Sequence, residues 1–112
     1  MVEVKVNSGI CGFNTTIEVE SNDMQHAIIH MESECGNIKK MSVQLKEVDG
    51  FKECFGGVGE CECFKVGRSC SIHAACPVPT AIIKGIEVAC GLALPKDVDM
   101  KIEEKSQQNK KR

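Results

Sequence analysis

Eight cysteines are distributed through a chain of only 112 residues, and their meaning depends on the compartment in which the protein folds. In an oxidising compartment, an even number of cysteines in a short chain indicates a disulfide framework. In a reducing compartment, the same number indicates metal binding, catalysis or small thiols packed in a core. The eight are Cys11, Cys35, Cys54, Cys61, Cys63, Cys70, Cys76 and Cys90.

The N-terminus favours a reducing compartment. Val2, Val4 and Val6 alternate with polar residues, which is typical of a strand and not of the continuous apolar segment of an export signal. No apolar stretch approaches the roughly 20 residues that a membrane-spanning helix requires. We therefore expect a cytoplasmic protein that does not enter a membrane and whose cysteines remain reduced.

The composition predicts one domain with an aliphatic core. Domains most often contain roughly 100–150 residues. Trp and Tyr are absent and Phe occurs four times, so Met and Cys must supplement the aliphatic residues in the core. The net charge of −2 argues against a nucleic-acid-binding protein, which carries a basic surface. We expect a single domain over residues 1–104 and a disordered polar tail over residues 105–112.

The spacing of the apolar residues predicts a mixture of strands and helices. Alternation of apolar and polar residues predicts strands at 2–6, 13–20, 41–45 and 98–102, the first two forming a hairpin. Helical spacing predicts helices at 23–34, 48–55 and 77–92, with a single turn at 69–75. The glycine-rich residues 56–70 fit either a short hairpin or an irregular loop. We predict an α+β fold of two layers, in which a small, mostly antiparallel sheet of about four strands packs against two or three helices.

Four cysteines lie where the predicted elements begin or end. Side chains at such boundaries can converge at one end of a sheet, and four thiolates can bind zinc tetrahedrally or hold an iron–sulfur cluster. Zinc ligands usually occur in pairs two to four residues apart, and this chain contains no C-x-x-C pair. On their positions, we expect a zinc or iron–sulfur site formed by Cys11, Cys35, Cys70 and Cys76.

Cys76 also suggests a different chemistry. It precedes a predicted helix, whose dipole and free N–H groups favour a thiolate and can lower its pKa well below about 8.5. His73 and Lys84 are near it in sequence and can add to this effect. A reactive Cys76, which acts as a catalytic nucleophile or carries persulfide sulfur, is therefore the alternative to a metal site. In the simplest interpretation, Cys76 only begins the helix and its thiol is packed.

The other candidate ligands have less support. His26 and His30 are four residues apart on one face of a predicted helix, but they lie away from its apolar residues and are expected to be solvated. His73 is the one histidine that we consider as a ligand or a proton donor. A third function, binding of a protein partner by a module with structural cysteines, has no motif in its favour. Cys90 is expected to pack inside the last helix, and the roles of Cys54, Cys61 and Cys63 are left open.

Two segments of the chain resemble known families. Cys76-Pro77-Val78-Pro79, followed by an apolar helix, resembles the Cys-Pro-x-Pro motif of the TusA-like sulfur carriers, a resemblance that implies a sulfur-carrying role for Cys76. The same segment, together with residues 8–13 and 93–98, resembles a small uncharacterised family of archaeal and anaerobic bacterial proteins. That resemblance covers most of the chain and implies a free-standing domain in the cytoplasm of an anaerobe, without an assigned activity.

Overall fold

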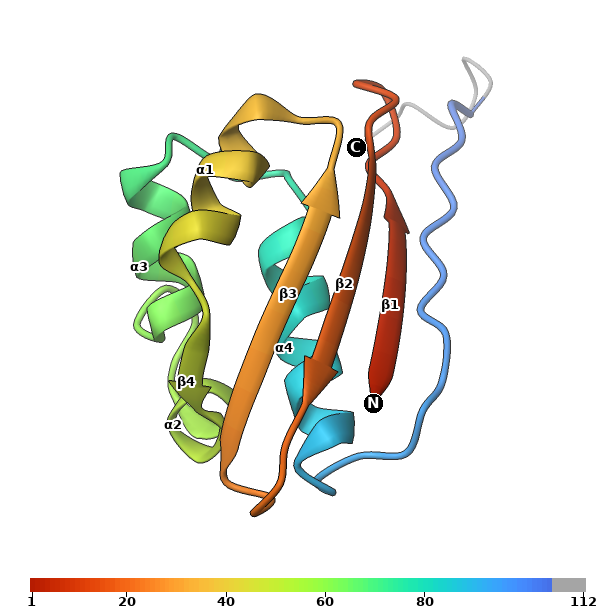
Figure 1. Ribbon diagram of the computed structural model, residues 1–112. Helices are drawn as coiled ribbons and strands as arrows, with labels where there is room; N and C mark the ends of the chain where they lie inside the picture. The colour runs from red at the N-terminus through yellow and green to blue at the C-terminus, as the bar shows by residue number, and fades with distance from the viewer. Residues whose placement is uncertain (106–112) are drawn as a thin grey trace.

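The computed structural model describes residues 1–105, in which four strands and four helices follow one another (Figure 1). The strands are β1 (Val2–Asn7), β2 (Asn14–Glu20), β3 (His26–Ser33) and β4 (Glu47–Asp49). The helices are α1 (Gly36–Gln44), α2 (Gly50–Phe55), α3 (Glu62–Ser69) and α4 (Val78–Ala89). Residues 106–112, which make up most of the predicted polar tail, lie outside the described residues.

The strands form one antiparallel sheet in the order β1-β2-β3-β4. Val4 pairs with Ile17, and Ile17 pairs with Met31, so the register places apolar side chains of three strands on the same face. On β2 and β3 this face is buried, whereas His30 and its neighbours on the opposite face of β3 are exposed. The alternation follows from the two-residue period of a strand.

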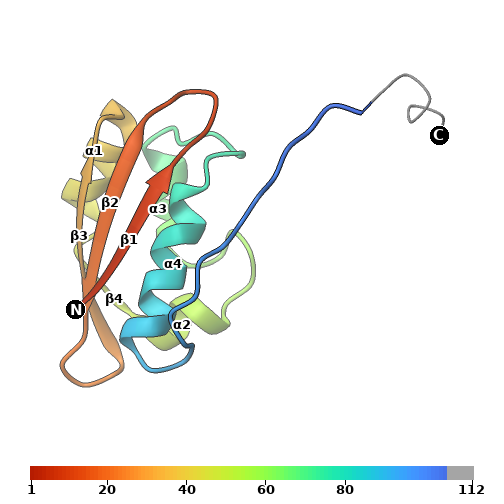
Figure 2. The ribbon, with the colours of Figure 1, turned by 90° about the vertical axis from the view of Figure 1, so that its right-hand side faces the viewer.

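Helices cover the apolar face of the sheet. Helix α4 packs across β1 and β2, α1 lies beside β3, and α2 and α3 both contact α4. Figure 2 shows α4 and α2 on one side of the sheet and no helix over the outer face of β1 and β2. A Cβ atom at Gly85 would lie only 3.1 Å from Cγ2 of both Val4 and Val19, so the glycine allows α4 to approach the sheet closely. This two-layer arrangement confirms the predicted α+β class, with four helices among the described residues instead of two or three.

The predicted helix at residues 23–34 is wrong, because most of this segment is β3. Asp23, the first residue of the predicted helix, instead accepts hydrogen bonds from the backbone N–H groups of Gln25 and His26 in the turn before the strand. The apolar residues of the segment fit both a helical and an alternating spacing. Pairing with residues 15–20 of β2 selects the strand, because it places Ala27 and Met31 in the core.

The predicted strand at residues 41–45 is also wrong, because these residues end α1. Ile38, Met41 and Leu45 are buried at helical spacing, whereas Val43 is 68% exposed. The helix begins at Gly36, two residues beyond the end of the helix predicted at 23–34.

Residues 56–70 contain a helix, α3, in place of the predicted hairpin or loop. The cap that stabilises its start comes from a different helix. One carboxylate oxygen of Glu53, in α2, accepts a hydrogen bond from the N–H of Glu62 at 2.8 Å, and the other accepts one from the N–H of Cys63 at 2.9 Å. Such a cap cannot be inferred from neighbouring residues, because its donor helix and acceptor side chain are separated along the chain.

The predictions near the C-terminus are partly correct. The helices expected at 48–55 and 77–92 are present, as α2 and α4. Residues 70–77 contain no helical turn, although one was predicted at 69–75. The strand predicted at 98–102 is wrong: these residues pair with no described strand, and Val98, Met100 and Ile102 are exposed.

Candidate functional site

Three of the four predicted ligands lie at the same end of the sheet. Cys11 is exposed in the β1–β2 turn, Cys35 is the half-buried N-cap of α1, and Cys76 is half-buried before the start of α4. In Figure 1 the β1–β2 turn, the start of α1 and the approach to α4 all lie toward the top of the molecule. Cys35 and Cys11 each make a small electrostatic contribution to the raised pKa of the Cys76 thiol, behind the larger effect of burial. We refer to Cys11, Cys35 and Cys76 as the three-cysteine cluster.

Local hydrogen bonds hold the turn that carries Cys11. The Asn7 side chain accepts from the N–H of Gly9 at 3.0 Å, and the N–H of Gly12 donates to the Gly9 carbonyl at 2.8 Å. Both glycines have positive φ, +85° and +75°, a conformation that other residues rarely adopt. Cys11 therefore projects from a turn whose glycines impose its shape.

Backbone and side-chain hydrogen bonds hold the other two segments. The N–H of Cys35 donates to Ser33 Oγ at 3.1 Å at the end of β3. The N–H of Cys76 donates to the carbonyl of His73 at 3.1 Å. The Asn37 side chain in the first turn of α1 donates to the carbonyl of Ser71 at 3.5 Å, which joins this helix to the chain between α3 and α4.

Two helices begin at the three-cysteine cluster, and neither N-cap residue, Cys35 of α1 or Pro77 of α4, makes a side-chain capping hydrogen bond. Their first-turn N–H groups and positive dipole ends therefore face this end of the molecule, an environment that favours sulfur anions. At Cys76 a hydrogen bond from the Val78 N–H does lower the thiol pKa, but burial raises it by more, and the net pKa is above its ordinary value. The lowered pKa expected for Cys76 is thus not found, because desolvation outweighs the helix start.

Cys70, the fourth predicted ligand, is buried at the end of α3. It is the C-cap of α3, is only 4% exposed and belongs to the hydrophobic core. Its sulfur is 3.9 Å from the Ser69 hydroxyl. All eight cysteines fall within the described residues and all are free thiols. Within residues 1–105, no three His, Cys, Asp or Glu side chains are already arranged to hold a metal ion.

A second group of thiols surrounds Glu53, the residue that caps α3. Burial raises the pKa of Cys54 to about 12, with smaller contributions from Glu87 and neighbouring cysteines. Burial also raises the pKa of Cys63, and the carboxylate of Glu53 adds to the shift. Cys61, the N-cap of α3, is buried beside them, and burial raises its pKa as well. These thiols are neutral at physiological pH and pack as small apolar groups, a role that the sequence left open.

The histidines have separate environments. His26 Nδ1 is 2.7 Å from Asp23 Oδ2, and this hydrogen bond raises the pKa of His26. His30 is exposed on the outer face of β3 and lies opposite Glu18 in the sheet register. His73 is exposed between α3 and α4. The solvated positions predicted for His26 and His30 agree with these exposures, although a strand and not a helix carries them.

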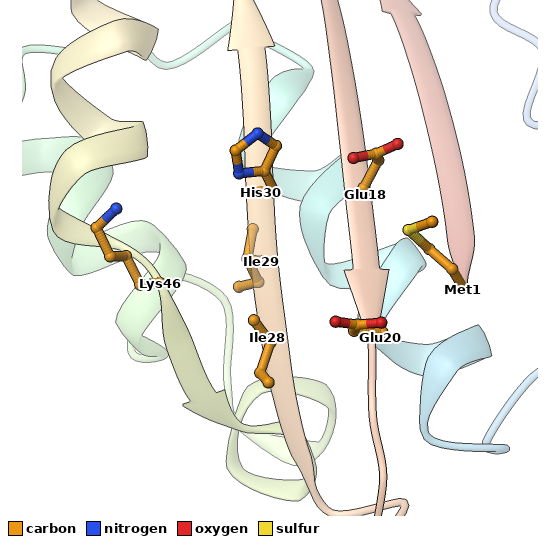
Figure 3. Close-up of a pocket in the computed structure, with 7 residues that line it drawn as sticks. All are labelled: Met1, Glu18, Glu20, Ile28, Ile29, His30 and Lys46. Carbon is orange, nitrogen blue, oxygen red and sulfur yellow. The ribbon is translucent and has the colours of Figure 1, made fainter.

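A depression of about 380 Å³ lies on the outer face of the sheet. Figure 3 shows its side chains projecting from β2 and β3, with Lys46 reaching in from the segment before β4. Carboxylates, an imidazole and an ammonium group are present, but the depression contains no cysteine. Its lining residues are Met1, Glu18, Glu20, Ile28, Ile29, His30 and Lys46.

All the strands, helices and cysteines described above lie within a region that matches one protein family. A family of unknown function, DUF6951, matches residues 2–102, from the first residue of β1 to the extended segment beyond α4. The chain belongs to this family. Membership in a family without an assigned activity, which the resemblance implied, is thereby confirmed, and the matched DUF6951 region contains every cysteine. No curated protein and no solved structure shows significant similarity to the chain. In the described part of the chain, no helix is long and apolar enough to cross a bilayer.

Proposed function

We propose that this DUF6951 protein binds a thiophilic metal, as zinc or as an iron–sulfur cluster, through the three-cysteine cluster and Cys70. The observation that carries the proposal is that the three chain segments bearing Cys11, Cys35 and Cys76 reach the same end of the sheet, with Cys11 and Cys35 both contributing to the pKa of Cys76. Soft thiolates are the ligands that zinc and iron–sulfur clusters prefer. In a reducing cytoplasm, where we place the protein, such thiols stay available for metal.

Two features of the cluster suit an anionic metal–thiolate group. The uncapped starts of α1 and α4 supply N–H donors and positive dipole ends to sulfur atoms that carry negative charge. Cys11 is exposed on its turn, so a metal can reach at least one ligand directly. Cys70 must approach from the core for a fourth sulfur ligand, since the described residues present no complete ligand set before metal binds.

The raised pKa of Cys76 gives the proposal a specific pH dependence. Its thiol must lose a proton to bind metal, and burial opposes this loss. Metal affinity should therefore rise with pH through neutrality and above, as protons leave the ligands.

The test is metal content of protein purified without oxygen, by elemental analysis and visible absorption. The absence of Trp and Tyr leaves the spectrum open for thiolate–metal bands. We expect about one zinc ion or one cluster per chain, and a loss of most metal in Cys11→Ser, Cys35→Ser and Cys76→Ser. Cys54→Ser is the matched control, because its thiol belongs to the second group and should leave metal content unchanged. Unchanged metal in all three cluster variants contradicts the proposal, and unchanged metal in Cys70→Ser alone removes Cys70 from the ligand set.

Nucleophilic or persulfide chemistry at Cys76 has weaker support in this geometry. It requires a thiolate near neutral pH, and burial shifts the pKa of Cys76 in the opposite direction. Selective alkylation of metal-free protein separates the two functions. A Cys76 thiol that reacts near pH 7 faster than an unfolded cysteine would favour sulfur chemistry over a metal site.

A further inference from the structure

Strand β1 leaves one edge of the sheet open. It pairs with β2 on one side, and no described strand lies on its other side. Its inward-facing residues Val2, Val4 and Val6 are only half-buried, whereas their counterparts on β2 are fully buried. An open edge with apolar side chains is a template for a further strand.

The segment beyond α4 exposes apolar side chains that no described strand covers. After the bend at residues 92–93, residues 94–105 run in extended form with no described strand of the sheet beside them. Val98 is 63% exposed, Met100 78% and Ile102 86%, and these three alternate with charged residues. The DUF6951 match ends at Ile102, the last of these apolar residues. The segment is therefore part of the family's domain, although its apolar face has no described neighbour that buries it.

The sequence of this segment complements the sequence of β1 when the two run antiparallel. When Val98, Met100 and Ile102 lie opposite the three valines of β1 in antiparallel order, the two intervening pairs carry opposite charges. These pairs are Glu3 with Lys101 and Lys5 with Asp99. Opposite charges directly across a sheet are stabilising, and like charges are destabilising.

The parallel direction does not achieve this match. With the same three apolar pairs in parallel order, Glu3 lies beside Asp99 and Lys5 beside Lys101. A shift of two residues restores opposite charges but places Val6 beside Glu104. The antiparallel register alone combines three apolar pairs with two opposite-charge pairs.

The chain cannot place its own segment in that register without reversing it. Figure 1 shows the segment rising from the end of α4 in the same direction as β1, and Figure 2 shows it leaving the sheet. A second copy related by a two-fold axis perpendicular to β1 presents its β1 in the opposite direction. We propose that residues 98–102 of one chain add as an antiparallel strand to β1 of a second copy of this chain, each copy donating its segment to the other.

The test is the oligomeric state of the full chain, measured by light scattering after size-exclusion chromatography over a range of concentrations. Reductant and a metal chelator are present, so that neither disulfides nor shared metal can join two copies. We expect a dimer that dissociates on dilution. This proposal does not depend on the three-cysteine cluster, and serine variants of the cluster should leave the dimer unchanged.

A charge swap tests the register. Lys101→Glu and Glu3→Lys should each raise the dissociation constant by about tenfold, because each places like charges opposite each other at both symmetry-related contacts. The double variant should restore the original value. Lys40→Glu, an exposed change on α1, is the matched control and should have no effect. A monomer at all concentrations, or a dimer that is insensitive to both single changes, would overturn the proposal.

Discussion

Gly50 begins α2 at the point where this helix meets the end of α4. A Cβ atom at this position would lie 2.5 Å from Cys90 Sγ, 3.0 Å from the carbonyl oxygen of Gln25 and 3.2 Å from Ile86 Cγ2. Favourable carbon contacts need roughly 3.5–4.0 Å, so all three atoms are too close. The backbone is also held, because the Gly50 N–H donates to the same Gln25 carbonyl at 2.6 Å. We therefore expect Gly50→Ala to destabilise the fold.

Several contributions determine the size of the effect. Overpacking a well-filled site costs about 1–3 kcal/mol, and weakening the Gly50–Gln25 hydrogen bond adds about 1 kcal/mol. The better helix propensity of alanine returns up to about 1 kcal/mol. The net loss is about 1–3 kcal/mol in the free energy of unfolding. For a domain of this size, that loss lowers Tm by roughly 5–15 °C.

Urea unfolding followed by far-ultraviolet circular dichroism measures this loss without the need for Trp fluorescence. Gly36→Ala is the matched control, because a Cβ atom there at the start of α1 meets nothing within 4 Å. Cys90→Ala in the Gly50→Ala background removes the closest contact, so the double variant should lose less stability than the sum of the two single changes, by about 1 kcal/mol. A Gly50→Ala protein as stable as the parent, or strictly additive losses in the double variant, would refute this reasoning.

Two predictions concern the group of thiols around Glu53. Glu53→Gln should lower the free energy of unfolding by about 1–3 kcal/mol in urea titrations, because the amide cannot accept from both capped N–H groups. Glu60→Gln, at an exposed position, is the control and should change the free energy of unfolding by less than about 0.5 kcal/mol. The pKa of Cys54 is raised from 9.0 to about 12 in the folded protein, so the folded state keeps a proton that the unfolded state loses. Stability from this group is fully present below about pH 9 and is lost as the pH rises toward 12. Unfolding measured under reductant at pH 8 and 10.5 should show the decline, and a Cys54→Ala variant with an equally steep decline would contradict the assignment.

Elements with unambiguous local patterns were predictable from the sequence. The first hairpin follows from alternating valines on β1, matching alternation on β2 and the Asn7–Gly9 turn between them. The start of α4 follows from Pro77 and Pro79, which suit a first helical turn. In both cases, the information lies within a few residues of the element that it specifies.

The segment at residues 23–34 shows why other elements were not predictable. Its apolar residues satisfy a helical spacing and an alternating one equally well, and Asp23 serves a turn as readily as a helix N-terminus. Pairing with β2 decides between a helix and a strand, because as a strand the segment buries Ala27 and Met31. That pairing is a property of the assembled sheet and not of the segment.

The positions of the cysteines were likewise predictable from the sequence only in part. The sequence by itself places Cys11, Cys35 and Cys76 at the boundaries of elements, and this holds whether a helix or a strand precedes Cys35. Tertiary structure alone decides that Cys70 is withdrawn into the core and that Glu53 caps α3 from another helix. Burial and capping depend on contacts between segments distant in the chain, and neither a residue's type nor its neighbours encode which distant group will come within hydrogen-bonding or packing distance.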